Sequence, residues 1–227
     1  MTDPADVARL LSGDWISRQP KAFQQALLDA VVWREVEAGT TINHAADKTG
    51  GILGLARGQI DIASALGVPG SPVVDICLPG QWGGIGPIFG RPRGADGTVR
   101  VASLVAKVPW PRLQPLLRDN PAWWECLGQL ANDFAFRFCG ATGDLLIRDA
   151  RKRCIAVLLR LADCRHRDPA TPPTIILNHA DFATVANMSR YPAGEVLREL
   201  DALGHIELGY RQVTILDAPA LRSIVDG

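Results

Sequence analysis

The clearest alternation of apolar and polar positions lies in residues 177–204. Phe182, Val185 and Ala186 repeat at intervals of three and one, as residues on one face of a helix do. A second apolar stripe of the same kind consists of Val196, Leu197, Leu200 and Leu203. The pattern predicts two short helices, joined by a turn at Asn187-Met188.

Residues suited to capping mark both predicted helices. Asn178 and Asp181 form a capping pair, which satisfies free N–H groups at a helix start. Ser189 is suited to cap the second helix, and Pro192 falls in its first turn, where no intrahelical N–H is required. Gly204 then ends this helix.

A small β-ribbon is predicted at residues 206–216, directly after the second helix. Two helices with a tight turn, followed by such a ribbon, form a winged helix-turn-helix, which places its second helix in the DNA major groove. A helical hairpin with no DNA-binding role is the alternative. Because the capping, the turn and the ribbon all agree, the sequence favours DNA binding.

The N-terminal half has another pattern. After short helices at residues 5–11 and 20–30, β-branched segments predict strands at residues 31–37, 40–43, 51–57, 59–66, 73–78 and 98–108. Turn signals separate these strands at Ala38-Gly39, Arg57-Gly58, Val68-Pro69-Gly70 and Pro79-Gly80, and along the glycine-rich stretch 83–97. This spacing predicts a small antiparallel barrel or sandwich.

A long helix is predicted after a short one at residues 110–118. Asn120 is suited to cap it, with Pro121 at its first position. Its apolar residues form a heptad stripe of Trp124, Leu127, Ala131, Phe134, Phe138, Ala141 and Leu145. Because a helix that links two domains is exposed, the stripe predicts a parallel dimer, with a single-chain core helix as the alternative. Gly140 and Gly143 weaken the helix and mark a joint.

The predicted elements divide the chain into three parts, which are residues 1–119, 120–148 and 149–227. Asp149 is suited to cap a helix over residues 150–164, and a polar, Pro-containing loop follows. A strand at residues 175–177 leads into the predicted helix-turn-helix, and a short helix at residues 218–225 closes the chain. The fold class is therefore α+β.

Composition limits the choice of function. Lys plus Arg is 24 and Asp plus Glu is 24, so a DNA-binding surface must come from the arrangement of charges rather than from their sum. The sequence has no apolar run of about 18 residues and no basic, apolar leader, so we expect a cytoplasmic protein without a membrane span. The five cysteines include no CxxC pair, which argues against a zinc knuckle.

The order of these elements resembles the cAMP receptor protein/FNR (Crp/Fnr) family of bacterial transcription regulators. The resemblance is carried by Asn120-Pro121, by ARKRCIAVLLRLA at residues 150–162 and by NHADFATVANMSRYPAGEVLREL at residues 178–200. The GQID turn and the PGQWGG segment also look like turns of the family's barrel. The resemblance implies a cyclic-nucleotide-binding-like jelly roll, a dimerisation helix and a winged helix-turn-helix.

The resemblance also implies partners and DNA contacts. The expected partners are an inverted-repeat operator in double-stranded DNA, a second copy of the chain and RNA polymerase. Arg190 corresponds to an arginine that reads guanine O6 and N7, and Ser189 to a phosphate contact. Tyr191, Pro192 and Glu195 depart from the usual residues. The expected DNA-contacting set is Asn178, Ser189, Arg190, Tyr191, Glu195, Arg198 and Arg211.

The positions that bind a small-molecule effector in the family depart further from the family pattern in this sequence. The Glu that holds the ribose falls on the Gly83-Gly84 pair, and the Arg that holds the phosphate falls near Asp96-Gly97. Three nearby cations, Arg91, Arg93 and Arg100, are able to substitute for that Arg. The candidate effector pocket is Gly83, Gly84, Arg100, Phe138 and Cys139. Without the family's contacts, burial of a ligand phosphate is costly, and we expect no tight cAMP binding.

No catalytic, metal or cofactor site is expected. An iron–sulfur cluster needs N-terminal cysteines, and the first is Cys77; the sensor part has a single histidine, His44. Cys126 and Cys139, on the long helix, leave a redox response open. Two alternatives therefore stand beside a DNA-binding regulator of unknown effector: a haem- or redox-responsive regulator, and a degenerate member that acts as a protein-interaction module.

Overall fold

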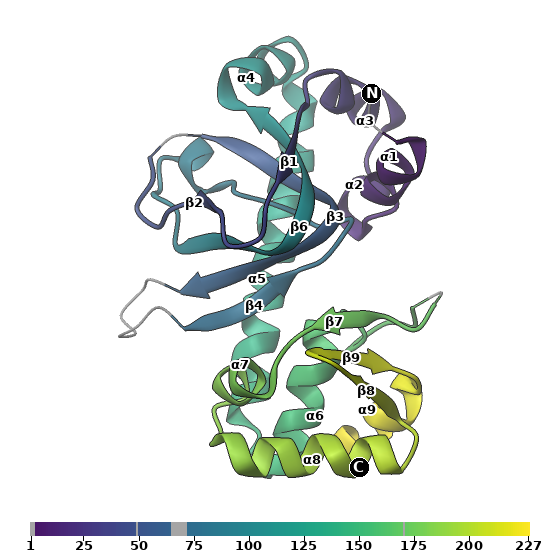
Figure 1. Cartoon of the computed structure of the whole chain (residues 1–227). Helices are drawn as coiled ribbons and strands as arrows, with labels where there is room; N and C mark the ends of the chain where they lie inside the picture. The colour runs from purple at the N-terminus through teal and green to yellow at the C-terminus, as the bar shows by residue number, and fades with distance from the viewer. Residues whose placement is uncertain (1–2, 49, 65–71, 170) are drawn as a thin grey trace. The chain divides into compact units, whose positions relative to one another are not determined.

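The computed structural model describes residues 3–48, 50–64, 72–169 and 171–227 (Figure 1). The chain divides into two compact units, which are Met1–Phe136 and Arg137–Gly227. The boundary falls inside the long helix α5, Trp124–Leu146, so this helix contributes residues to both units. No helix in the described part of the chain is long and apolar enough to cross a membrane.

The first unit begins with the helices α1 (Pro4–Leu11), α2 (Asp14–Ser17) and α3 (Lys21–Asp29). The Asp3 carboxylate caps α1 by accepting from the Ala5 N–H at 2.8 Å. Both helices predicted here are present, while α2 was not predicted, because four residues are too few to show a helical period.

An antiparallel sheet follows, as the sequence predicts. Its strands are β1 (Val32–Val36), β2 (Thr41–Asn43), β3 (Gly51–Ser64), β4 (Val73–Cys77), β5 (Trp82–Gly83) and β6 (Ala95–Pro109). The order is β1-β6-β3-β4, with β2 also paired to β6 and β5 to β3. The long strands β3 and β6 pair from Gly51 opposite Pro109 to Ser64 opposite Ala95, and this is the longest strand pairing of the sheet.

The turn predicted at Arg57-Gly58 is wrong, because β3 continues through both residues. Gly58 has a φ of 100°, and a Cβ added there would lie 2.0 Å from Oγ of Ser103. The glycine marks a place where the β3–β6 register shifts and the strands approach closely, rather than the end of a strand. The turn predicted at residues 68–70 and the last residues of the preceding strand lie outside the described residues.

Apolar side chains cover both faces of this sheet. On one face, the helices α1 to α3, α4 (Trp110–Asp119) and the first half of α5 form a core that includes Leu10, Phe23, Ile52, Ala56, Leu113 and Leu127. On the other face, Leu55, Ile60, Val99 and Val105 form a second buried cluster. Successive residues such as Leu55 and Ala56 point to opposite faces, which explains this division.

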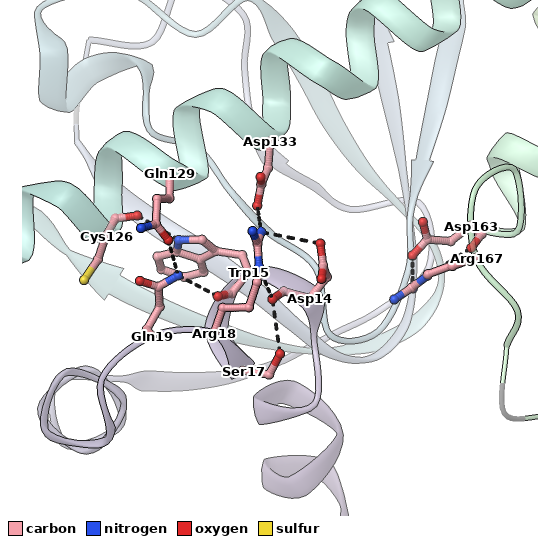
Figure 2. A network of polar contacts seen from close by, with 10 residues as sticks. All are labelled: Asp14, Trp15, Ser17, Arg18, Gln19, Cys126, Gln129, Asp133, Asp163 and Arg167. Atoms are coloured by element: carbon pink, nitrogen blue, oxygen red, sulfur yellow. Dashed lines mark hydrogen bonds and ion pairs between the residues drawn. The ribbon is translucent and has the colours of Figure 1, made fainter.

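Helix α2 is fastened to α5 by polar contacts (Figure 2). Arg18 Nη2 lies 2.5 Å from Asp133 Oδ2, and Trp15 Nε1 donates to the Cys126 carbonyl at 2.8 Å. Burial raises the pKa of Asp133, and the charge of Arg18 opposes that shift. Figure 2 also draws the ion pair between Asp163 and Arg167, which belongs to the second unit.

The start of α5 differs from the prediction. A short 3₁₀ helix, η2 (Pro121–Trp123), precedes it, with Pro121 in its first turn. Within the described chain, the Asn120 side chain forms no capping hydrogen bond to this helix. Its Nδ2 donates instead to the Leu116 carbonyl at 3.4 Å, and its backbone N–H donates to the same carbonyl at 3.1 Å. Asn120 therefore closes α4 rather than capping the long helix.

The predicted dimer stripe needs correction at two positions. Leu127 is 0% exposed in the core of the first unit, and Phe134 packs against that core, so neither side chain is available to a second copy. A helical period shows which residues are buried but not what buries them. The remaining stripe residues, Trp124, Ala131, Phe138, Ala141 and Leu145, are exposed or half-buried.

A different heptad face of α5 is exposed along most of the helix. It lies one position later than the predicted stripe and consists of Gly128, Asn132, Ala135, Cys139, Thr142 and Leu146. We call this set the outward face of α5. Its residues are mostly small.

The second unit contains the predicted helix-turn-helix and wing (Figure 1). Its elements after α5 are α6 (Ala150–Leu161), β7 (Thr174–Ile176), α7 (His179–Val185), α8 (Arg190–Ala202), β8 (Ile206–Gly209), β9 (Gln212–Ile215) and α9 (Ala218–Asp226). The Asp149 carboxylate caps α6 as predicted, by accepting from the Lys152 N–H at 2.8 Å. The three strands pair in the order β7-β9-β8.

Candidate nucleic-acid interface

Asn178 caps α7, as the sequence predicts. Its Oδ1 accepts from the N–H groups of Ala180 and Asp181, each at 2.9 Å, and its Nδ2 donates to Asp181 Oδ2 at 2.9 Å. These bonds use both the oxygen and the nitrogen of the side-chain amide, so the main role of Asn178 in this structure is to cap α7. The turn follows where predicted, with Asn187 in the left-handed region at a φ of 51°.

The first turn of α8 is exposed. Ser189 occupies the N-cap position, but its side chain forms no capping hydrogen bond within the described residues, which corrects that part of the prediction. Arg190 is exposed, and no ion-pair partner for it is found in the part of the chain that the structure describes. Tyr191 is 75% exposed. A hydroxyl, a guanidinium and a phenol therefore stand together at the head of this helix.

The rest of α8 separates a buried face from an outward one. Ala193, Gly194, Leu197 and Leu200 are buried. Tyr191, Glu195 and Arg198 follow one another at i, i+4 and i+7, and all three are exposed on the other face. Glu195 and Arg198 form an ion pair with each other. We call these three residues the outward stripe of α8.

Two further acidic residues of α8 are tied to neighbouring elements. Arg151 of α6 binds Glu199, with Nη2 2.7 Å from Oε1, and this hydrogen bond lowers the pKa of Glu199 and raises that of Arg151. Asp201 accepts from the Leu208 N–H of β8 at 2.9 Å. These contacts hold α8 against α6 on one side and against the wing on the other.

The wing presents its turn to solvent. Arg211 lies at the hairpin turn with a φ of 54°, its side chain is exposed, and its carbonyl accepts from the Leu177 N–H at 2.9 Å. Tyr210, beside it, is 92% exposed and was not singled out in the sequence. The chain has two tyrosines, and both lie on exposed parts of this domain. The sequence could have indicated Tyr210, because this residue lies at the tip of the predicted ribbon.

Arg153 fixes the turn of the helix-turn-helix to the end of α5. Its Nε donates to the Ala186 carbonyl at 3.0 Å, and its Nη1 donates to the Ile147 carbonyl at 2.8 Å. Ala186 ends α7, and Ile147 follows the last residue of α5. A single guanidinium therefore bridges the joint after α5 and the turn before α8.

The candidate effector residues are divided between the two units. Gly83 lies in β5, and a Cβ added there would lie 2.7 Å from Cζ of Phe134, so this aromatic ring occupies the space beside it. Arg100 is held in an ion pair with Asp61, with Nε 2.5 Å from Oδ1. Phe138 and Cys139 belong to the second unit, where both are exposed.

Arg93, rather than Arg100, lies beside Gly84. Its Nη1 donates to the Gly84 carbonyl at 3.1 Å. Gly84 has a φ of 87°, and a Cβ there would lie 2.6 Å from the same nitrogen. Burial lowers the pKa of Arg93, and the charge of Asp47 opposes that shift. Among the described residues, no group of three or more His, Cys, Asp or Glu side chains is placed to hold a metal ion.

Comparison with known proteins identifies the second unit's domain. The sequence of residues 152–224 matches the Crp-like helix-turn-helix domain family. No match was found among curated proteins. Solved structures share the fold over most of their length. One of these, a regulatory protein from Silicibacter pomeroyi DSS-3, is 18% identical over 99% of this chain and 100% of that chain, with a TM-score of 0.68.

Two further solved structures have the same fold. The c-di-GMP-responsive global regulator CLP of Xanthomonas campestris is 18% identical over 86% of this chain and 99% of that chain, with a TM-score of 0.65. A CRP/FNR-family transcriptional regulator from Thermus thermophilus is 18% identical over 86% of this chain and 99% of that chain, with a TM-score of 0.59. At this identity the likeness shows the fold. Residues 152–224 therefore form a Crp-like helix-turn-helix domain, and the chain as a whole has the fold of these regulators.

Proposed function

We propose that the protein binds an inverted-repeat operator in double-stranded DNA as a homodimer, and that Arg190 is its principal base reader. The observation that carries this proposal is the exposed first turn of α8, where Arg190 has no ion-pair partner among the described residues. A free guanidinium there is able to form two bonds to O6 and N7 of guanine. Ser189 and Arg211 supply contacts to phosphates, which set the register without reading sequence.

The dimer uses the outward face of α5. Leu127 and Phe134 already pack in the core of their own chain, so we place the second copy on the face of α5 whose residues are all exposed. Its heptad spacing is that of a two-stranded coiled coil, and small residues at Gly128 and Ala135 permit a close approach. A two-fold dimer presents two copies of α8, which reach successive half-sites when they stand about 34 Å apart.

The sensor part binds no cyclic nucleotide tightly in this proposal. Gly84 supplies no carboxylate for a ribose hydroxyl, the Phe134 ring lies against Gly83, and Arg93 is bonded to the Gly84 carbonyl. A ligand would have to displace both the ring and the guanidinium. Titration calorimetry with cAMP and cGMP tests this, and a dissociation constant of about 1 μM or below for either nucleotide contradicts it.

The remaining partners rest on the resemblance to the Crp/Fnr family and on the Crp-like helix-turn-helix domain. We propose that the DNA-bound dimer contacts RNA polymerase and that it acts in the cytoplasm. Retention of purified polymerase by the protein on its operator tests this contact, and equal retention by the operator alone contradicts it.

An electrophoretic mobility shift with Arg190→Ala tests the DNA contact. The variant should lose about 1–3 kcal/mol of binding free energy at a specific site. Arg118→Ala is the matched control, because Arg118 is also an exposed arginine but lies on α4 of the first unit. Wild type and the control should bind alike. Equal binding by Arg190→Ala and wild type contradicts the proposal.

A further inference from the structure

The outward stripe of α8 carries a carboxylate where a DNA-binding helix faces polyanionic DNA. Glu195 is 53% exposed and Arg198 is 54% exposed, and the two side chains form an ion pair one turn apart on the same helix. Tyr191 precedes them on the same face. The pair therefore lies on the surface that α8 presents, rather than at its edge against α6 or the wing.

A carboxylate in the major groove discriminates strongly between bases. It only accepts hydrogen bonds, and the groove offers donors only at cytosine N4 and adenine N6. Adenine places its N7 acceptor beside N6, and that acceptor repels an anion, whereas cytosine has no acceptor on its groove edge. Guanine and thymine present acceptors. The base that Glu195 accommodates is therefore cytosine.

The cost of placing Glu195 near the phosphates has to be offset. An unpaired carboxylate there is repelled by the DNA backbone, which carries one negative charge per about 1.7 Å of helix axis. Arg198 offsets that charge in the free protein. Since its guanidinium is solvent-exposed and its stem is flexible, it can turn to a phosphate at little cost while remaining near Glu195.

We infer that Glu195 reads a cytosine in each half-site and that Arg198, by neutralising Glu195 and binding a phosphate, makes this reading possible. The inference rests on the proposed function, specific DNA binding through α8. It adds a specificity-determining residue and names the base that this residue selects. It also explains how a helix with an acidic residue on its outward stripe remains able to bind DNA.

Selection of bound sequences from a random DNA pool tests the reading of cytosine. Wild type should enrich one cytosine in each half-site that Glu195→Ala no longer enriches, with the other positions unchanged. Glu195→Gln should shift that position to adenine, because an amide pairs with N6 and N7. Glu199→Ala is the matched control, because Glu199 is also an exposed, arginine-paired glutamate of α8 but is held toward α6. It should keep the cytosine.

Affinity measurements over a range of salt concentrations test the role of Arg198. Arg198→Ala should weaken binding to all sequences by about tenfold and lower the salt-dependence slope by about one. Removing the carboxylate as well, in the double variant Glu195→Ala/Arg198→Ala, should restore part of the lost affinity. Circular dichroism confirms that each variant is folded.

Several outcomes overturn the inference. It is wrong if Glu195→Ala keeps the cytosine, or if the double variant binds no better than Arg198→Ala. If Arg190→Ala still weakens specific binding in either case, the proposed function stands and only the role of Glu195 fails. If wild type enriches no sequence at all, both fail together.

Discussion

Asp144, in the last turn of α5, forms a buried ion pair with Arg160 of α6, with the two atoms Oδ2 and Nε 3.0 Å apart. Arg165 Nε lies 3.7 Å from the other carboxylate oxygen. The side chains of Asp144, Arg160 and Arg165 are 7%, 10% and 18% exposed. One carboxylate and two guanidinium groups therefore hold the end of the long helix to α6 and to the segment that follows it.

Asp144→Asn should destabilise the second unit. The change removes the carboxylate that Arg160 and Arg165 share. Breaking a buried pair in this way costs about 3–5 kcal/mol, and the desolvation of the Asp144 carboxylate offsets part of this loss. Asp163→Asn is the control, because Asp163 pairs with Arg167 in the same unit but their side chains are 36% and 53% exposed. Its cost should stay below about 1 kcal/mol. Urea unfolding measures both, and similar losses for the two variants contradict this account.

The Asp144 pair also predicts a pH dependence. Burial raises the pKa of Asp144 above its ordinary value of 3.8, although Arg160 and Arg165 oppose the shift. A carboxyl group whose pKa is higher in the folded state contributes most to stability below its unfolded pKa, and this contribution falls as pH rises through the folded pKa. Relative to Asp144→Asn, the free energy of unfolding of wild type should therefore decrease as pH rises from 3.8. An increase over that window contradicts the assigned shift.

Gly58 should be intolerant of a side chain. Gly58→Ala places a Cβ against Ser103. The φ of 100° at this position also strains any residue that has a Cβ. The expected loss is about 1–3 kcal/mol from backbone strain alone, with the steric clash in addition. Gly39→Ala is a suitable control, because Gly39 has a φ of 84° but nothing within 4 Å of an added Cβ. Thermal unfolding should show a larger loss for Gly58→Ala, and equal losses would remove the argument from close packing.

The sequence predicts some elements better than others. The helix-turn-helix was predictable because its caps and turn are local: Asn178 bonds to residues two and three positions away. The burial of Leu127 inside its own chain was not, because an apolar period on α5 is equally consistent with a dimer seam and with a core inside one chain. The cation beside Gly84 was not predictable either, since spacing in a glycine-rich loop does not determine which arginine folds back.

Cys139 offers a direct test of the proposed dimer face. It is the exposed cysteine of α5, and in a two-fold dimer through the outward face it lies opposite its own copy. Mild oxidation with copper phenanthroline should produce a disulfide-linked dimer, which Cys139→Ser should lack. Cys154 and Cys164 should not react, because burial raises the pKa of each thiol to about 11. A linked dimer that persists in Cys139→Ser contradicts this face.

The measurement that tests the account most directly is selection of bound DNA from a random pool by wild type and Arg190→Ala in parallel. Wild type should enrich an inverted repeat whose half-sites lie about one helical turn apart, with a guanine in each half-site. Arg190→Ala should lose that guanine in both halves. Enrichment of a single half-site, or of the same sequences by both proteins, would contradict a dimer that reads DNA through the first turn of α8.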